Sequence, residues 1–269
     1  MSFYRIGFIG CGNMGGAVAE AVCRRTDPKN VSISNRTAEK SAVFAQKTGC
    51  TVSDSSTIAR ECELIYLAVK PQMMREALEP LQAVLAARTD RFVLCTMAAG
   101  LSAASVREMA GGSYPIIRIM PNTPASVGEG MIQYCCSGVT AEEEESFLSL
   151  MQDCGILDAI PEKLIDAASS VSGCGPAWAY QFIEALADGG VACGLPRAKA
   201  QQYAAQMLLG SAKLVLESKK HPGELKDAVC SPGGSTIRGV RVLEERAFRG
   251  AVTDAVIAAY EKTVEMGKN

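Results

Sequence analysis

The feature that most constrains the fold of this chain is the run Gly10-Cys11-Gly12-Asn13-Met14-Gly15, a Gly-x-Gly-x-x-Gly motif. It directly follows an apolar, strand-like stretch at Ile6–Ile9 and directly precedes a helical stretch. In that setting Gly10 permits a tight turn, Gly12 lets a pyrophosphate approach the backbone, and Gly15 allows the helix to pack closely on the strand. The helix N-terminus then faces the anion. The motif predicts a dinucleotide site, against the alternative of a purely structural turn.

The residues after the second expected strand bear on which nicotinamide cofactor is bound. A NAD-specific domain carries Asp or Glu about 20 residues after the motif, where it holds the 2'-hydroxyl of the adenine ribose. Here Asn35 stands 20 residues after Gly15, and Arg36 follows it. A guanidinium suits a 2'-phosphate. NADPH is therefore favoured over NADH, which stays the alternative if Arg36 is only a solvated loop residue.

The pattern of the whole chain indicates two domains. Residues 1 to about 125 alternate short β-branched runs with amphipathic stretches, as βαβ units do. Strands are expected at Arg5–Ile9, Val31–Ser34, Leu64–Val69, Phe92–Thr96 and Ile116–Met120, and helices beginning near Asn13, Ala38, Gln72 and Ser102. From about Pro161 onward, Ala, Leu, Met and Gln recur in long helical segments. We expect an α/β, Rossmann-type doubly wound parallel sheet over residues 1–160 and an all-α domain over residues 161–269.

Two turns follow later strands of the expected sheet. They are Ala68-Val69-Lys70-Pro71 and Met97-Ala98-Ala99-Gly100. The carboxyl ends of the strands are where an open α/β sheet forms its ligand crevice, and small residues there allow a cofactor to approach. These residues are therefore candidate cofactor contacts, although the same small residues serve equally well in ordinary turns.

The helical half is expected to self-associate. Trp178–Val191 and Ala198–Leu216 are rich in Ala and apolar around most of their circumference. Helices of that kind are usually buried, here against a second subunit. The alternative is a thick monomeric bundle.

Two loops that contain Gly and Pro each stand just before a helical stretch. They cover residues 172–177 and 230–236. Free backbone N–H groups at a helix start suit a carboxylate, and Ser235 and Thr236 add hydroxyl donors. The alternative is a pair of ordinary N-cap turns.

Composition excludes several classes of function. The 27 basic and 29 acidic residues nearly balance and form no basic block, so nucleic acid is not an expected partner. No secretory signal and no apolar run of the roughly 20 residues that cross a bilayer are apparent, so we expect a cytoplasmic protein. The eleven cysteines lack C-x-x-C spacing and His221 is the only histidine, so we expect reduced thiols and no metal.

Taken together, the motifs resemble pyrroline-5-carboxylate reductases along nearly the whole chain. The glycine motif and the turns described above belong to this set. The further members, in chain order, are Met120-Pro121-Asn122-Thr123-Pro124, Gly173-Cys174-Gly175-Pro176-Ala177, residues 187–191 with Gly194-Leu195-Pro196, His221-Pro222-Gly223 and Ser231-Pro232-Gly233-Gly234. The resemblance implies reduction of the cyclic imine 1-pyrroline-5-carboxylate to L-proline by hydride transfer from NADPH. It also implies a homodimer that shares its active site, or a higher assembly such as a decamer. A protonated imine is already electrophilic, so the absence of a histidine base is consistent with this reaction, and His221 is expected to be a turn residue.

The resemblance also assigns site residues by position. Thr236 is the expected catalytic residue, and the substrate contacts are Gly175, Pro176, Gly233, Gly234, Ser235 and Thr236. The cofactor contacts are Gly10, Gly12, Asn13, Met14, Gly15, Asn35, Arg36, Ser55, Ala68, Val69, Lys70, Pro71, Ala98, Ala99, Gly100, Asn122 and Pro124. Three positions depart from the family pattern: Cys174 replaces a usual Ser, Trp178 a usual Tyr, and Ser55 a frequent Asn.

Two other functions stay open. A 3-hydroxyacid dehydrogenase of the 6-phosphogluconate or 3-hydroxyisobutyrate kind also combines such a motif with a helical domain. A resemblance to those enzymes would imply a catalytic Lys on the first long helix after the sheet. No Lys occurs here between Lys163 and Lys199. The other alternative is a non-catalytic NADP-binding regulator, against which the loop at residues 232–236 argues.

Overall fold

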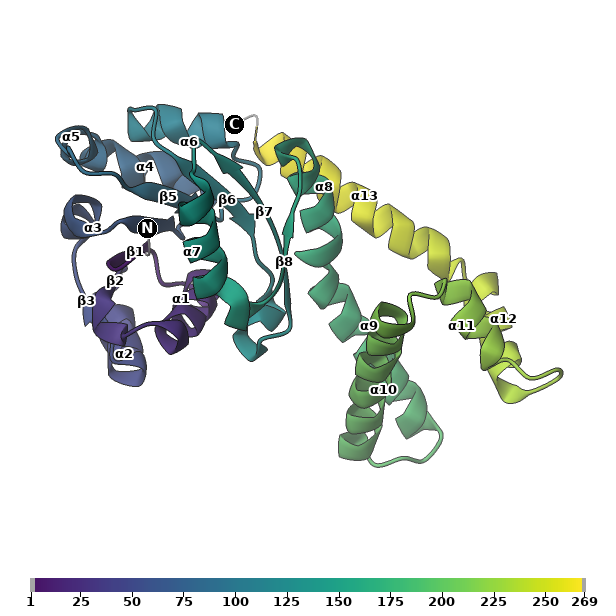
Figure 1. Cartoon of the computed structure of the whole chain (residues 1–269). Helices are drawn as coiled ribbons and strands as arrows, with labels where there is room; N and C mark the ends of the chain where they lie inside the picture. Colours follow the sequence, from purple (N-terminus) through teal and green to yellow (C-terminus); the bar gives the residue numbers. More distant parts are fainter. Residues whose placement is uncertain (1–2, 268–269) are drawn as a thin grey trace. The chain divides into compact units, whose positions relative to one another are not determined.

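The structure, a computed structural model, describes residues 3–267. The first part of the chain builds one sheet with helices on both faces (Figure 1). Its strands are β1 Ile6–Ile9, β2 Val31–Ser34, β3 Thr51–Val52, β4 Leu64–Leu67, β5 Val93–Thr96, β6 Ile116–Met120, β7 Gly130–Ser137 and β8 Gly155–Ala159. The helices are α1 Asn13–Arg25, α2 Ala38–Thr48, α3 Ser55–Glu61, α4 Met74–Leu78, α5 Gln82–Ala86, α6 Ala103–Ala110 and α7 Ala141–Met151. The expected Rossmann-type sheet is confirmed, and β2 and β6 have the predicted bounds.

The strand order places a ligand crevice beside β1. The order is β3-β2-β1-β4-β5-β6-β7-β8, and β1 pairs in parallel with both β2 and β4. The chain therefore winds outward to both sides from β1, and the carboxyl ends of β1 and β4 form the switch point at which such sheets bind ligands.

Both faces of the sheet are buried along β1, β4, β5 and β6, because most successive residues of these strands are apolar. On one face Phe8 and Tyr66 stack with their ring centroids 4.3 Å apart, in a cluster that includes α1 and α7. On the other face Ile65 and Leu67 join a cluster that includes α3 to α6. Burying each such side chain contributes about 1.5–3 kcal/mol. The two clusters fix the sheet as a rigid platform for the loops at its edge.

Strands β3, β7 and β8 and helices α3 and α7 were not predicted. The β7 strand runs antiparallel to β6, with Met120 opposite Gln133, and β8 pairs in parallel with β7. The last two strands thus run opposite to the first six. Short 3₁₀ turns connect several elements, among them η2 Pro71–Met73, η4 Thr123–Val127 and η5 Gln152–Cys154.

The rest of the described chain is helical, as predicted. Its helices are α8 Glu162–Ser172, α9 Gly175–Ala192, α10 Arg197–Ser218, α11 Pro222–Ala228, α12 Ser235–Glu245 and α13 Phe248–Met266. Two compact units result, one of residues 1–174 with 259–269 and one of residues 175–258. Because α8 packs on β6 and β7, it belongs to the first unit. The domain boundary expected at residue 160 stays a prediction.

The unit of residues 175–258 has little core of its own. Its buried residues are small, namely Ala187, Ala200 and Ala204. Large apolar side chains are exposed along α9 and α10, with Tyr180 and Leu209 both 59% and Leu216 67% accessible. Such extended apolar exposure is typical of an interface with another chain. None of the helices within residues 3–267 has the length and apolar character needed to span a membrane.

Candidate functional site

The glycine loop is shaped by close backbone packing against the end of β4. Gly10 has φ +101°, and a Cβ there would lie 2.6 Å from the Ala68 carbonyl oxygen. A Cβ on Gly15 would lie 2.7 Å from the Ala68 Cβ, so both positions exclude any larger residue. A Cβ on Gly12, by contrast, would meet nothing within 4 Å. The open space beside Gly12 and the uncapped start of α1 leave N–H groups free for an anion.

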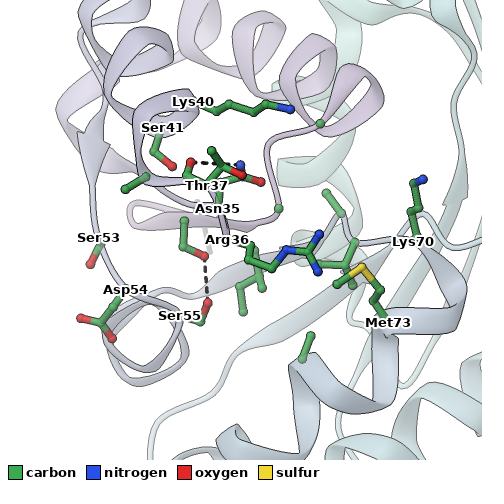
Figure 2. A pocket seen from close by; sticks show the side chains of 18 of the residues that line it. Asn35, Arg36, Thr37, Lys40, Ser41, Ser53, Asp54, Ser55, Lys70 and Met73 are labelled. Carbon is green, nitrogen blue, oxygen red and sulfur yellow. Dashed lines mark hydrogen bonds between the residues drawn. The ribbon is translucent and has the colours of Figure 1, made fainter.

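A cavity of about 630 Å³ lies at the carboxyl ends of β1, β2 and β4 (Figure 2). The predicted cofactor residues that line it are Gly10, Gly12, Asn35, Arg36, Ser55, Ala68, Val69 and Lys70. The predicted cofactor residues outside its lining are Asn13, Met14, Gly15, Pro71, Ala98, Ala99, Gly100, Asn122 and Pro124. The structure thus gathers the glycine loop, the end of β2 and the end of β4 around one space.

The charges that line this cavity suit a phosphate. Arg36, Lys40 and Lys70 all line it, and among residues 3–267 none of the three forms an ion pair. Figure 2 shows Arg36 extending into the cavity from the loop after β2. Two carboxylates, Asp54 and Glu76, also line the cavity. Asp54 accepts hydrogen bonds from the amide and hydroxyl of Thr57, and these lower the pKa of its carboxyl. Asp54 is thus committed to capping α3, while the cations are free to bind a ligand.

Hydrogen bonds hold the polar lining in place. The Asn35 Oδ1 atom accepts from the Cys11 amide at 3.3 Å, and the Asn35 amide donates to the Thr37 carbonyl at 3.2 Å. Asn35 therefore ties the glycine loop to the end of β2. The Ser34 and Ser55 hydroxyls lie 2.9 Å apart, which joins β2 to the start of α3.

Sequence reasoning missed several lining residues on α2 and α4. Lys40 and Ser41 lie in the first turns of α2, and Met73 and Glu76 line the cavity near α4. The Ser41 hydroxyl is buried and has no hydrogen-bond partner in the described part of the chain. Helical spacing from Arg36 could not have found Lys40, because Arg36 lies in the loop before α2, which begins at Ala38.

The turn after β5 is contacted by the end of the last helix. Gly100 has φ +77°, and a Cβ there would lie 2.8 Å from the Thr263 carbonyl oxygen and 3.0 Å from the Gly267 nitrogen. Ala98 is buried, and Ala99 and Gly100 are half-buried. Residues 263–267 therefore pack against Gly100, in the turn that is predicted to contact the cofactor.

Asn122 stands two residues after the end of β6 and is the N-cap residue of η4. It is only 7% exposed, and both its polar atoms are bonded within the protein. Pro124 follows in η4 and is half-buried. Cofactor contact by these two residues stays a prediction.

The two loops of the helical region both precede helices, as predicted. Helix α12 begins at Ser235, after Gly233 at φ +70° and Gly234 as its N-cap residue. The Ser235 and Thr236 side chains are exposed, and neither hydroxyl has a hydrogen-bond partner within residues 3–267. With the uncapped N–H groups of the first turn, they present several donors to a carboxylate.

The other loop leads into α9. Helix α9 begins at Gly175 and Pro176, and beside Gly175 a Cβ would meet nothing within 4 Å. Cys174, which departs from the family pattern, is half-buried, and its amide donates to the Ser169 carbonyl at 3.2 Å.

His221 has a structural position. Its Nδ1 atom accepts from the Gly223 amide at 3.0 Å and caps α11. Within residues 3–267, no three His, Cys, Asp or Glu side chains come together as a metal site would require.

Comparison with known proteins gives matches along the whole chain. The family model described as pyrroline-5-carboxylate reductase dimerisation matches residues 162–266. The model described as NADP oxidoreductase, coenzyme F420-dependent, matches residues 5–98. The pyrroline-5-carboxylate reductase of Escherichia coli is 39% identical, over 98% of this chain and 99% of its own length. The reductase of the same name from Pisum sativum is 38% identical, over 98% of this chain and 96% of its own.

Solved structures of pyrroline-5-carboxylate reductases are also similar to this chain. The Plasmodium falciparum pyrroline carboxylate reductase with NADP bound is 34% identical and superposes with a TM-score of 0.87, over 98% of each chain. The Streptococcus pyogenes 1-pyrroline-5-carboxylate reductase is 30% identical, with a TM-score of 0.88 over 98% of this chain and 99% of its own.

Proposed function

The chain belongs to the pyrroline-5-carboxylate reductase family, and from this premise we propose how its residues carry out the reduction of 1-pyrroline-5-carboxylate to L-proline, the last step of proline synthesis. It is an NAD(P)H-dependent oxidoreductase. The observation that carries the function is the similarity to reductases of this name over 98% of the chain. The remaining proposals concern cofactor choice, substrate contacts and assembly.

NADPH is the proposed cofactor, and NADH is the weaker alternative. No carboxylate stands at the end of β2 to hold a ribose 2'-hydroxyl, since Asn35 occupies that position and bonds within the protein. Arg36 and Lys40 line the same cavity without carboxylate partners, which suits a 2'-phosphate. The open space beside Gly12 fits the pyrophosphate. When bound, the cofactor supplies the hydride that reduces the C=N bond.

The substrate contacts are proposed at two helix starts. At α12, the backbone N–H groups and hydroxyls of Ser235 and Thr236 would hold the substrate carboxylate, with Gly233 and Gly234 shaping the turn. At α9, Gly175 and Pro176 would offer backbone contacts. Reduction adds two hydrogens, one as hydride to carbon and one as a proton on nitrogen. A protonated imine carries that proton already, so Thr236 orients the ring and no general base is needed.

We also propose a homodimer or larger assembly, up to a decamer, in the cytosol. The support for self-association is the match of residues 162–266 to a dimerisation family and the exposed apolar side chains of α9 and α10. Residues 161–269 are the proposed dimerisation and substrate domain, after a cofactor domain of residues 1–160.

A direct assay tests the proposed function. The purified protein should oxidise NADPH when 1-pyrroline-5-carboxylate is added, with L-proline as the product. A 3-hydroxyacid dehydrogenase would instead reduce NADP⁺ with a hydroxyacid, and a non-catalytic regulator would bind NADPH without turnover. Either result would contradict the proposal.

A further inference from the structure

A buried polar cluster ties the end of α8 to the carboxyl edge of the sheet. We call Asn122, Gln133 and Ser172 the Asn122 cluster. The Asn122 amide donates to the Ser172 carbonyl at 3.0 Å, and the Ser172 hydroxyl donates to the Gln133 Oε1 atom at 3.0 Å. Asn122 is 7% and Gln133 4% exposed. Water therefore has little access to the Asn122 and Gln133 side chains. The hydroxyl of Ser172, which is half-buried, also lies 3.1 Å from the Ala168 carbonyl oxygen, a second acceptor.

The geometry of Asn122 requires a side chain with both a donor and an acceptor. While its amide nitrogen donates to Ser172, its Oδ1 atom accepts from the Met131 amide at 3.0 Å. An aspartate of the same shape keeps the acceptor but loses the donor and places a carboxylate against a carbonyl. An alanine loses both. Asn122 thus joins the end of α8 to the backbone of β7.

The residues that follow Ser172 in the chain lead directly to the proposed substrate contacts Gly175 and Pro176. Ser172 is the last residue of α8, and the amides of Gly173 and Cys174 still donate to the Ser169 carbonyl at 2.7 and 3.2 Å. Only these two residues separate α8 from Gly175, where α9 begins. A shift of Ser172 therefore also moves Gly173 and Cys174, the last residues before Gly175.

We infer that Asn122 is a positioning residue for the reductase reaction, which holds residues 172–174 in place just before the proposed substrate contacts rather than contacting the cofactor. This inference rests on the proposed function, in particular on Gly175 and Pro176 as substrate contacts. A displacement of about 1 Å in a positioning group can lower the rate about a hundredfold, so the effect should appear in catalysis.

The test compares Asn122→Asp and Ser172→Ala with the wild-type protein. Each is measured for kcat and KM with 1-pyrroline-5-carboxylate, for the NADPH Kd by fluorescence titration, and for thermal stability. Asn122→Asp should lower kcat/KM by about ten- to a hundredfold and leave the NADPH Kd within about twofold. Ser172→Ala, which removes only the hydroxyl, should lower kcat/KM by about three- to tenfold. If Asn122→Asp does not fold, Ser172→Ala decides.

A matched control separates positioning from loss of stability. Glu143 is also buried, at 6% exposed, and accepts hydrogen bonds from Arg91 at 2.6 and 2.9 Å. Arg91 lies just before β5, at the opposite end of the strands. Glu143→Gln should therefore lower the melting temperature while kcat/KM at 25 °C stays within about twofold of the wild type. Protonation of the carboxyl introduced by Asn122→Asp would restore a donor, so the activity of this variant relative to wild type should rise as the pH is lowered.

Three outcomes would overturn the inference. A tenfold or greater loss of NADPH affinity in Asn122→Asp would make Asn122 a cofactor contact. A kcat/KM no lower than that of Glu143→Gln in both cluster variants would make the cluster purely structural. A wild-type protein that is itself inactive with 1-pyrroline-5-carboxylate would instead refute the proposed function, and the inference with it.

Discussion

The three glycines of the loop after β1 should respond differently to the same substitution, because their surroundings differ. Gly10→Ala forces a Cβ onto a residue with φ +101°, 2.6 Å from the Ala68 carbonyl oxygen. Gly12→Ala adds its methyl to open space, at φ −79° and ψ −169°, which any residue adopts. The first change perturbs the fold, and the second perturbs only what would lie beside the loop.

The magnitudes follow from these contacts. At Gly10 the backbone strain costs about 1–3 kcal/mol and the steric overlap about another 1–3 kcal/mol, so the free energy of unfolding should fall by about 2–6 kcal/mol. At Gly12 the lower entropy of the unfolded chain and the poorer N-cap nearly cancel, so the change should stay within about 1 kcal/mol. For NADPH, the added methyl group would hold the pyrophosphate away from the backbone. Losing one charge-assisted hydrogen bond in this way, at about 1.5–3 kcal/mol, weakens binding about ten- to a hundredfold.

Urea denaturation at fixed protein concentration measures the stability of each variant, and NADPH fluorescence titration measures its affinity. Gly12→Ala should unfold at the same urea concentration as the wild type and bind NADPH poorly. Gly10→Ala should unfold at a lower urea concentration than the wild type. Wild-type NADPH affinity in Gly12→Ala would refute the claim that the pyrophosphate passes this residue. A loss of stability in Gly12→Ala as large as in Gly10→Ala would show that Gly12 has a structural role.

Four further predictions concern separate parts of the molecule. Arg36→Ala should weaken NADPH by about ten- to a hundredfold and leave NADH nearly unchanged in parallel titrations; equal losses would make Arg36 structural. Thr236→Ala should lower kcat/KM by about ten- to a thousandfold without changing NADPH affinity; full efficiency would leave recognition to the backbone amides, and lost NADPH binding would place Thr236 against the cofactor. Sedimentation at micromolar concentration should find a dimer or larger assembly, and a monomer would contradict the proposed interface. Burial raises the pKa of Glu143, but hydrogen bonds from Arg91 and the Thr140 amide bring it below its ordinary value. The charged carboxylate therefore stabilises the fold at any pH above the unfolded pKa. This contribution is lost as the pH falls through the folded pKa. Glu143→Gln should then cost about 1–2 kcal/mol at pH 7, and this cost should shrink as the pH falls through the lowered folded pKa; a cost that does not vary with pH would contradict the ion pair.

The sequence predicted best those parts of the fold that depend on neighbouring residues. The strands Val31–Ser34 and Ile116–Met120 are rich in β-branched residues, and each is flanked on both sides by Asn or by Pro, so their bounds were predicted correctly. Strand β7 was missed because Gln133 and two adjacent cysteines interrupt any β-branched pattern, and its position depends on pairing with β6. Strand β3 has only two residues, too few for a periodic signal.

The residues of the candidate site also divide into those that local sequence predicts and those that depend on distant contacts. Gly10 and Gly15 were predictable because a backbone turn and a close approach demand glycine locally. Lys40 and Ser41 were not found, because the turn of α2 brings them to the cavity. The bond between Asn122 and Ser172 joins residues 50 apart in sequence, and no local pattern indicates such a partner.

The contact between Gly100 and the end of α13 has a consequence for folding during synthesis. Residues 259–269 belong to the same compact unit as residues 1–174, and residue 267 packs against the turn after β5. Roughly ninety residues must be translated after residue 174 before that contact can form, which takes about 5 to 20 s at typical rates of elongation. Through this interval the sheet can assemble while the turn at Gly100 lacks its support. The cofactor-binding unit is therefore among the first parts of the chain to begin folding and the last to be completed.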